Sequence, residues 1–344
     1  MADYETGRAF LNGLTLGARV AIAYHGDADG TGSAALAHRF LERTGWVAAG
    51  TLAPDKGEDL YGPSFAARLQ ETRPDALLVL DQGSRARPIL PGTPTLVVDH
   101  HDAPPEGVPV DVYLSGLDEE PTPNAALMTW RLLSPLADLA DVRWYAAVGI
   151  IGDLGADAPF AELAEMKKAF GQKNLAEVVA LVNAAKRSAE HDTTTSLAAL
   201  LDAQTPAAIA KGQVQQFATL SGYRNEVKAE RERCAKTAPK FAGDWAVLRF
   251  ASPCQIHGPV ASSWVGRLPK NIVLAANEGY TPGNVHFSVR TKRADLNLLD
   301  RLRALRDVLG EAEFGQGHAR ATGGVLTQEQ FARFLQEIGF ASVS

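Results

Sequence analysis

Three short apolar runs in the first part of the chain place the strongest limit on its fold. They are RVAIAYH at residues 19–25, DALLVLD at residues 75–81 and TLVVDHH at residues 95–101. Each run is continuous rather than alternating, which is typical of strands buried on both faces of a parallel sheet. The stretch SAALAHRFLER at residues 33–43 has apolar residues at helical spacing and precedes Gly45. Strands and helices therefore alternate, and we predict a doubly wound α/β domain with a mainly parallel sheet.

The rest of the chain divides further. A mostly helical region completes the first domain, which we place at residues 1–205. A stretch rich in Glu, Lys and Arg precedes Pro239 and predicts a helical linker at residues 206–240. Residues 241–344 predict a second, smaller α/β domain, with a cleft between the two domains. Its expected elements are strands at 245–250, 271–277 and 285–290, a helix at 296–308 and a glycine-rich turn at 315–324.

Composition excludes several classes of protein. A length of 344 residues is typical of two domains. No apolar stretch approaches the roughly 18 residues of a membrane span, and the acidic, mixed N-terminus lacks the features of a signal peptide, so we expect a cytoplasmic protein. The two cysteines form no CxxC pair, which argues against a disulfide framework or a thiolate zinc site. The net charge of -6 argues against a protein that binds long duplexes.

Potential metal ligands follow each of the three apolar runs. In open parallel sheets, ligands bind beyond the carboxyl ends of the strands. So many carboxylates in one place would repel one another unless cations neutralised them. A lone aspartate at a strand end is usually a turn residue or a helix cap, so the prediction depends on the joint arrangement. The residues are His25, Asp27 and Asp29, then Asp81, and then Asp99, His100 and His101.

The ligand types narrow the choice of metal. Imidazole and carboxylate without thiolate suit Mn²⁺, Mg²⁺ or Co²⁺ better than a structural zinc, and we expect Mn²⁺. Two ions about 3.5 to 4 Å apart would activate a water and stabilise in-line phosphoryl displacement. Asp153, in the apolar segment GIIGDLG, is a further candidate ligand, because an unpaired aspartate there would be costly to bury. The glycines of HGDADGTGS would let a helix N-terminus face a phosphate.

These segments resemble the motifs of the DHH phosphoesterases, a family that includes RecJ-type nucleases, nano-RNases and cyclic-dinucleotide phosphodiesterases. HGDADGTGS is similar to the first motif, LDQGS to the second, VVDHH to the third and GIIGDLG to the fourth. NAAKR, within LVNAAKRSAEHD, resembles the NAAGR segment of the RecJ branch. VHFSVRTKRADLNLLDRL and GQGHARATGG resemble the DHH-associated C-terminal domain. The resemblance covers about residues 18–330.

The resemblance implies roles for individual residues. One metal would be bound by His25, Asp27 and Asp81, and the other by Asp29, Asp81, His100 and Asp153, so that Asp81 bridges the two. Asp99 would orient a neighbouring histidine. His101 would face the scissile phosphate as an electrostatic stabiliser or proton donor.

The resemblance also implies a substrate-binding set. Gln316 stands where the family usually has a glycine, which makes this part of the resemblance weaker than the metal site. A guanidinium suits a terminal phosphate because it donates two parallel hydrogen bonds. The set consists of Arg290 and His318, the loop glycines Gly315, Gly317, Gly323 and Gly324, and Asn183 and Arg187 of the NAAKR segment.

Three functions remain open. The leading one is a two-metal exonuclease that hydrolyses short single-stranded RNA or DNA to mononucleotides, which the NAAKR segment favours. The second is a phosphatase or phosphodiesterase acting on a linear or cyclic dinucleotide, phosphoadenosine phosphate or polyphosphate, which the modest size and negative charge favour. The third is an inactive nucleic-acid-binding scaffold, which the retained ligands argue against. We expect no membrane partner, and a homodimer is compatible with all three.

Overall fold

A computed structural model describes residues 2–104, 106–311 and 314–340. The chain divides into two compact units, and each is described by itself. The first consists of Met1–Lys186 and His191–Arg224, and the second of Arg187–Glu190 and Asn225–Ser344.

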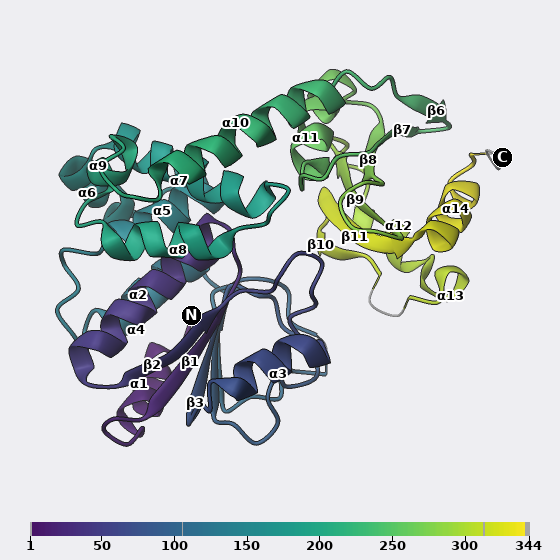
Figure 1. The fold of residues 1–344 in the computed structure, drawn as a ribbon. Coiled ribbons are helices and arrows are strands. Elements are labelled where there is room, and N and C mark those ends of the chain that lie inside the picture. The colour runs from purple at the N-terminus through teal and green to yellow at the C-terminus, as the bar shows by residue number, and fades with distance from the viewer. Residues whose placement is uncertain (1, 105, 312–313, 341–344) are drawn as a thin grey trace. The chain divides into compact units, whose positions relative to one another are not determined.

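The first unit is built on a five-stranded parallel sheet with the order β2-β1-β3-β4-β5 (Figure 1). The three strands predicted from the apolar runs are present as β1, β3 and β4, and they are neighbours in the sheet. The edge strands β2 and β5 were not predicted, because most of their residues are only half-buried and neither segment forms a continuous apolar run like those of β1, β3 and β4. The strands are β1 (Arg19–Tyr24), β2 (Val47–Leu52), β3 (Ala76–Leu80), β4 (Thr95–Asp99) and β5 (Val112–Ser115).

Helices cover both faces of this sheet, which confirms the doubly wound architecture (Figure 1). On one face, Val20, Ile22 and Tyr24 of β1 pack in one core with α2, α4 and α5. On the other face, Ala21 and Ala23 pack with α3. The helices of this unit are α1 (Tyr4–Asn12), α2 (Ala28–Thr44), α3 (Pro63–Glu71), α4 (Ala125–Leu133), α5 (Trp144–Asp153), α6 (Ala161–Phe170), α7 (Gln172–Arg187), α8 (Thr193–Asp202) and α9 (Pro206–Ala210).

One further helix, α10 (Phe217–Cys234), spans the point at which the chain passes from the first unit to the second. It begins within the charged stretch from which a linker helix was expected. Its sequence is strongly polar, including the run RNEVKAERER, so it lacks the continuous apolar stripe of a core helix.

The second unit contains a six-stranded mixed sheet with the order β10-β11-β9-β8-β7-β6. Among the described strands of this sheet, β7 and β8 pair in parallel and the other neighbours are antiparallel. This confirms the predicted second α/β domain. The elements are β6 (Lys240–Ala242), β7 (Trp245–Phe250), α11 (His257–Arg267), β8 (Ile272–Asn277), β9 (Asn284–Thr291), α12 (Leu298–Arg303), α13 (Arg306–Leu309), β10 (Gln316–His318), β11 (Ala321–Thr327) and α14 (Gln328–Glu337).

Two local predictions in this unit were wrong. The helix expected at residues 296–308 is two short helices, α12 and α13. The expected glycine-rich turn at residues 315–324 contains the β10–β11 hairpin, in which Gln316 pairs with Gly323. Glycines usually indicate loops, but Gly323 lies in a strand. A glycine is needed at this position because an added Cβ would meet the Phe287 carbonyl oxygen at 2.5 Å.

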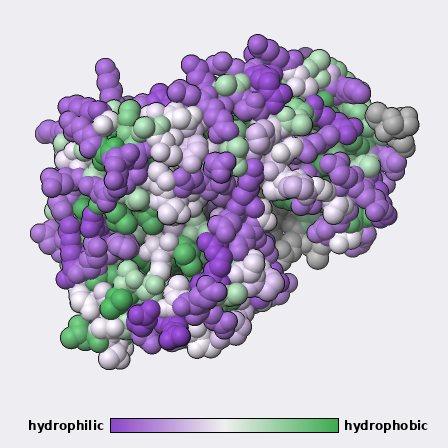
Figure 2. All heavy atoms as spheres, in the orientation of Figure 1, coloured by the Kyte–Doolittle hydropathy of each residue, from purple (hydrophilic) through white to green (hydrophobic). Residues whose placement is uncertain are grey.

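None of the described helices is both long and apolar enough to span a lipid bilayer. The face drawn in Figure 2 is covered mainly by hydrophilic residues, with hydrophobic residues in small groups between them.

Candidate metal centre

The predicted metal ligands converge at the carboxyl ends of β1, β3 and β4. His25, Asp81 and His100 each follow one of these strands directly. Asp27 and Asp29 lie at the start of α2, and Asp153 is the last residue of α5. The first unit therefore brings together all six predicted ligands, although they span 129 positions of sequence.

One group of possible ligands consists of His25, Asp27 and Asp81. The Nδ1 atom of His25 lies 3.1 Å from Asp27 Oδ2 and 3.5 Å from Asp81 Oδ2. One possible ligand atom from each of these residues lies within 4.8 Å of the others, a spacing that a single ion can bridge. Imidazole nitrogen and carboxylate oxygen are ligands that suit Mn²⁺ and related divalent ions.

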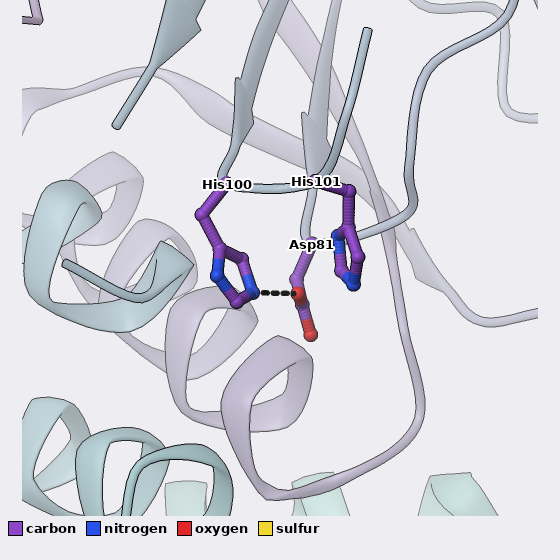
Figure 3. Close-up of side chains that lie close together, drawn as sticks. All are labelled: Asp81, His100 and His101. Carbon is purple, nitrogen blue, oxygen red and sulfur yellow. Dashed lines mark ion pairs between the residues drawn. The ribbon is translucent and has the colours of Figure 1, made fainter. Parts of the chain in front are cut away.

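A second group consists of Asp29, His100 and Asp153. The Nε2 atom of His100 lies 3.7 Å from Asp29 Oδ2 and 3.8 Å from Asp153 Oδ2. The same nitrogen lies 3.4 Å from Asp81 Oδ1, the ion pair drawn in Figure 3. Asp153 is the most exposed of these ligands, with 37% of its side chain accessible, so this group faces solvent on the side of Asp153.

Asp81 joins the two groups. Its Oδ2 atom faces His25 and its Oδ1 atom faces His100, and in Figure 3 its carboxylate lies between His100 and His101. The backbone of Asp81 has φ 59°, a left-handed conformation that costs energy in residues other than glycine. The carboxylate is thus held between two candidate ion sites by a strained turn immediately after β3.

The structure fixes Asp29 through the N-terminus of α4. Its Oδ1 atom accepts hydrogen bonds from Asn124 Nδ2 and Ala126 N, both at 2.7 Å, and its Oδ2 atom accepts one from Ala125 N at 3.1 Å. The helix dipole favours a negative charge at this position. Gly149 of α5 allows this close packing, because an added Cβ would lie 2.9 Å from Asp29 Oδ1.

Burial and mutual repulsion shape the electrostatics of the carboxylates. Burial, followed by the charges of Asp81 and Asp153, raises the pKa of Asp29 well above its usual range. Burial also raises the pKa of Asp153, although His100 opposes this. Burial likewise acts to raise the pKa of Asp27, but the charge and hydrogen bond of His25 outweigh it and lower that pKa. Four carboxylates this close together fit divalent cations, which would remove the repulsion.

Asp99 and His101 form a hydrogen-bonded pair, and His101 also belongs, with Asp81 and His100, to a third group of possible ligands. His101 donates a hydrogen bond from Nδ1 to Asp99 Oδ1 at 2.8 Å, and Asp99 is fully buried. Burial alone would lower the pKa of His101, but the hydrogen bond and charge of Asp99 raise it to about 9. The pair has the geometry expected of an aspartate that orients a histidine, and His101 Nε2 remains for a further contact.

The expectation that the start of α2 would face a phosphate was wrong. Asp27 caps this helix by accepting hydrogen bonds from the backbone N–H groups of Asp29 and Gly30. Asn183 Oδ1 accepts from Ala28 N at 3.0 Å. The protein itself therefore satisfies these donors. Asn183, predicted to contact substrate, supports the turn that carries Asp27 and Asp29.

Two residues near the ligands were missed in the sequence. Asn124 is the N-cap of α4 as well as a donor to Asp29, and the segment NAALM carried a signal for it, an asparagine followed by an apolar helix. Lys186 of α7 lies with Nζ 3.1 Å from His25 Nε2. No sequence signal indicated Lys186, because its contact spans 161 positions.

The remaining predicted substrate residues belong to the second unit. In the sheet, His318 is paired with Ala321 and Ala321 with Arg290, so Arg290 and His318 lie in one row. Gly315 and Gly317 have positive φ. Gly324 lies in β11, where Phe287 packs against it. Arg187 ends α7, and its carbonyl oxygen accepts a hydrogen bond from Gln255 N at 2.8 Å.

Arg290 is half-buried, and its Nη1 donates to the carbonyl oxygens of Val289 and Thr322, both at 3.0 Å. Burial lowers its pKa. Among the residues that the structure describes, no carboxylate pairs with Arg290. A half-buried guanidinium without an anionic partner is suited to bind an anionic ligand.

Comparison with known proteins connects this architecture to a family. No protein-family model matches the sequence, and neither does any curated protein. Among solved structures, RecJ from Thermus thermophilus in complex with Mn²⁺ has a TM-score of 0.71 at 21% identity, covering 97% of this chain and 53% of that one. The exonuclease RecJ bound to manganese has a TM-score of 0.70 at 20% identity, covering 98% and 95%.

A DHH domain from a member of a family of ribosomal proteins has a TM-score of 0.66 at 15% identity, covering 97% and 88%. The chain thus spans about half the length of the Thermus RecJ and nearly all of the second RecJ chain. These matches extend over both units. The chain therefore has the fold of the DHH phosphoesterases, as the sequence motifs indicated.

Proposed function

We propose that this protein is a phosphoric ester hydrolase that uses two divalent ions, Mn²⁺ foremost, to cleave short single-stranded oligonucleotides to mononucleotides. The observation that carries the proposal is the placement of Asp81, whose two carboxylate oxygens face two separate groups of ligands. A carboxylate placed in this way can hold two ions close together, and a pair of ions about 3.5 to 4 Å apart suits in-line phosphoryl transfer. Matched structures of RecJ hold Mn²⁺ or Mg²⁺, which supports a divalent ion at this site.

Each group of residues would have a distinct role in the reaction. His25, Asp27 and Asp81 would hold one ion, and Asp29, Asp81, His100 and Asp153 the other. Bound there, the ions would supply an activated water and a positive field for the phosphate. His101, oriented by Asp99, would contact an oxygen of the phosphate and stabilise its charge or donate a proton to the leaving oxygen.

Residues of the second unit would bind the end of the substrate. Arg290 has a guanidinium without a carboxylate partner among the described residues, and it lies in one row of the sheet with His318. We assign the terminal phosphate to Arg290 and the neighbouring nucleotide to His318 and the glycines of the hairpin. Arg187, at the end of α7, would contact the substrate, and Asn183 of the same helix would act by supporting the turn that carries Asp27 and Asp29.

The test is a turnover assay with matched variants. The purified protein with Mn²⁺ is incubated with 5′-labelled RNA and DNA oligomers of two to about twenty nucleotides. Asp81→Asn removes the shared charge while retaining a residue type that tolerates a left-handed backbone. Asp157→Asn, at an exposed aspartate outside the ligand groups, is the control.

We expect mononucleotide release that is fastest on the shortest oligomers, lost in Asp81→Asn and retained in Asp157→Asn. Turnover that survives Asp81→Asn would contradict the two-metal site. Failure of the wild-type protein to bind Mn²⁺, together with inactivity, would instead favour the scaffold.

The negative net charge of the chain supports a second candidate function. With a net charge of -6, the protein lacks the overall positive charge that attracts long strands. A dinucleotide, phosphoadenosine phosphate or polyphosphate would need fewer contacts. Including these compounds, with a cyclic dinucleotide, in the same assay distinguishes the candidates, because turnover confined to them would assign the site to small molecules.

A further inference from the structure

A surface groove of the second unit lies between the end of α10 and α11. Its volume is about 640 Å³, which is within the range of sites that bind small molecules. All of its lining residues belong to the second unit, so the groove depends only on the fold of that unit. The lining residues are Glu232, Ala235, Lys236, Trp264 and Arg267.

Trp264 gives the groove an aromatic wall. Its Nε1 donates a hydrogen bond to the carbonyl oxygen of Ala235 at 3.2 Å, which holds the indole against the end of α10. The ring is half-buried and packs against the core beneath α11. The guanidinium of Arg267 lies over the ring, with Cζ 5.0 Å from the ring centroid. Indole and guanidinium together form one stacked platform.

Cations gather around this platform, although the net charge of the chain is -6. Lys236 and Arg267 line the groove itself, together with the acidic Glu232. Lys228 and Arg231 lie about one helical turn before the α10 residues of the groove, so they are on the same side of the helix. All four cations are exposed. The groove is therefore locally positive.

The charges of these four cations are available to a ligand. Within residues 2–104, 106–311 and 314–340, no carboxylate forms an ion pair with any of them, whereas Arg233 of the same helix pairs with Glu230. Cations beside an aromatic ring are the combination with which proteins bind single-stranded nucleic acid. A base stacks on the ring or on a guanidinium plane, and the cations attract the phosphates.

We propose that this groove binds a nucleotide of single-stranded nucleic acid, with its base stacked on the Trp264–Arg267 platform and its phosphates beside Lys236 and Lys228. The inference rests on the proposed function, in which single-stranded oligonucleotides are the substrate. It adds a contact that requires no metal ion. An acidic peptide would use the cations alone, without stacking on the platform.

The experiment measures binding in chelator, where turnover is absent. Fluorescence anisotropy of 3′-labelled RNA and DNA single strands of about twelve nucleotides gives the Kd at several salt concentrations. Arg267→Gln and Lys236→Gln each remove one charge from an exposed residue, and Trp264→Leu removes the ring while retaining an apolar side chain. Lys211→Gln, at an exposed lysine of the first unit, is the control.

We expect Arg267→Gln and Trp264→Leu to weaken oligonucleotide binding about tenfold, a typical effect of losing a stacking surface. Arg267→Gln and Lys236→Gln should each reduce the slope of log Kd against log salt by about 0.7, because each loses one phosphate contact. A purely structural role would leave this slope unchanged. Lys211→Gln should behave like the wild type.

Unchanged affinity and salt slope in Arg267→Gln and Lys236→Gln would overturn the inference, even if Trp264→Leu were unstable. So would a wild-type protein that binds no oligonucleotide in chelator. Competition by a polyglutamate peptide as strong as that by unlabelled oligonucleotide would assign the groove to an acidic protein instead. Oligonucleotide binding that depends on the groove, without cleavage in Mn²⁺, would contradict the proposed function alone, so the two failures are distinguishable.

Discussion

Replacing Asn124 by alanine should test how the second ligand group is held. Asn124 makes two hydrogen bonds with its side chain, donating to buried Asp29 Oδ1 at 2.7 Å and accepting from Leu127 N at 3.2 Å as the N-cap of α4. A buried hydrogen bond to a charged group contributes about 1.5 to 3 kcal/mol. The N-cap contributes about 1 kcal/mol. We therefore expect Asn124→Ala to lower the free energy of unfolding of the metal-free protein by about 2.5 to 4 kcal/mol.

The same substitution should weaken metal binding, because Asp29 would lose the donor that orients its carboxylate. Loss of a residue that orients a ligand typically weakens metal affinity about 10- to 100-fold. At a fixed excess of Mn²⁺, a tenfold loss removes about 1.4 kcal/mol of the stabilisation that the ion provides. The loss of stability in Mn²⁺ should therefore exceed the loss in chelator.

Urea unfolding of each variant, followed by circular dichroism with chelator and with excess Mn²⁺, measures both effects. Asn297→Ala is the matched control, because Asn297 caps α12 by accepting from Leu299 N at 3.0 Å and belongs to none of the ligand groups. It should cost about 1 kcal/mol in either condition. The reasoning would be refuted if Asn124→Ala cost no more than Asn297→Ala and responded to Mn²⁺ like the wild type.

Three further outcomes are expected. In a thermal scan, excess Mn²⁺ should raise the melting temperature of the wild type by several degrees and leave that of Asp81→Asn unchanged, because an ion at about 100-fold excess over its Kd stabilises the protein by about 2.7 kcal/mol. An equal rise in both proteins would argue against binding at Asp81. Gly149→Ala should destabilise the protein by about 1 to 3 kcal/mol in urea unfolding, because the added Cβ would lie 2.4 Å from Ala126 Cβ. A stabilised variant would show that α4 and α5 can separate without cost. Arg290→Lys should abolish most of the KM difference between 5′-phosphorylated and unphosphorylated oligomers, because lysine cannot reproduce the planar guanidinium; a preserved difference would remove Arg290 from phosphate binding.

The strands and the candidate ligands could be predicted from the sequence for one physical reason. Strands buried on both faces must be continuously apolar, so the charged residues that follow them are conspicuous, as in LVLD and VVDHH. The edge strand β2 lacks this signal because its residues are only half-buried. The hairpin of β10 and β11 was taken for a turn because its glycines serve close packing rather than chain reversal.

Long-range contacts were the part that could not be predicted. Asn124 is recognisable as a helix cap, but nothing in its neighbourhood indicates that it also binds Asp29 across 95 positions. In the sequence, Lys186 looks like any other polar residue of a helix. The start of α2 resembled an anion site in sequence, whereas the structure uses Asp27 and Asn183 to satisfy its donors. Side chains that meet only after packing leave no local pattern.

Strand order explains why Asp81 takes the shared position. In the sheet, β3 lies between β1 and β4, and the three strands end at nearly one level. Tyr24 lies beside Leu80, and Leu80 lies beside Val98, one residue before the end of β4. Neighbouring strands are about 4.8 Å apart, so a side chain directly after the middle strand is within reach of those that follow both neighbours. Chain order alone does not give this arrangement, because β2 follows β1 in sequence but is placed on the outer side of β1. Had β2 been inserted between β1 and β3, His25 and Asp81 would be separated by a further strand, and no single carboxylate could face both His25 and His100.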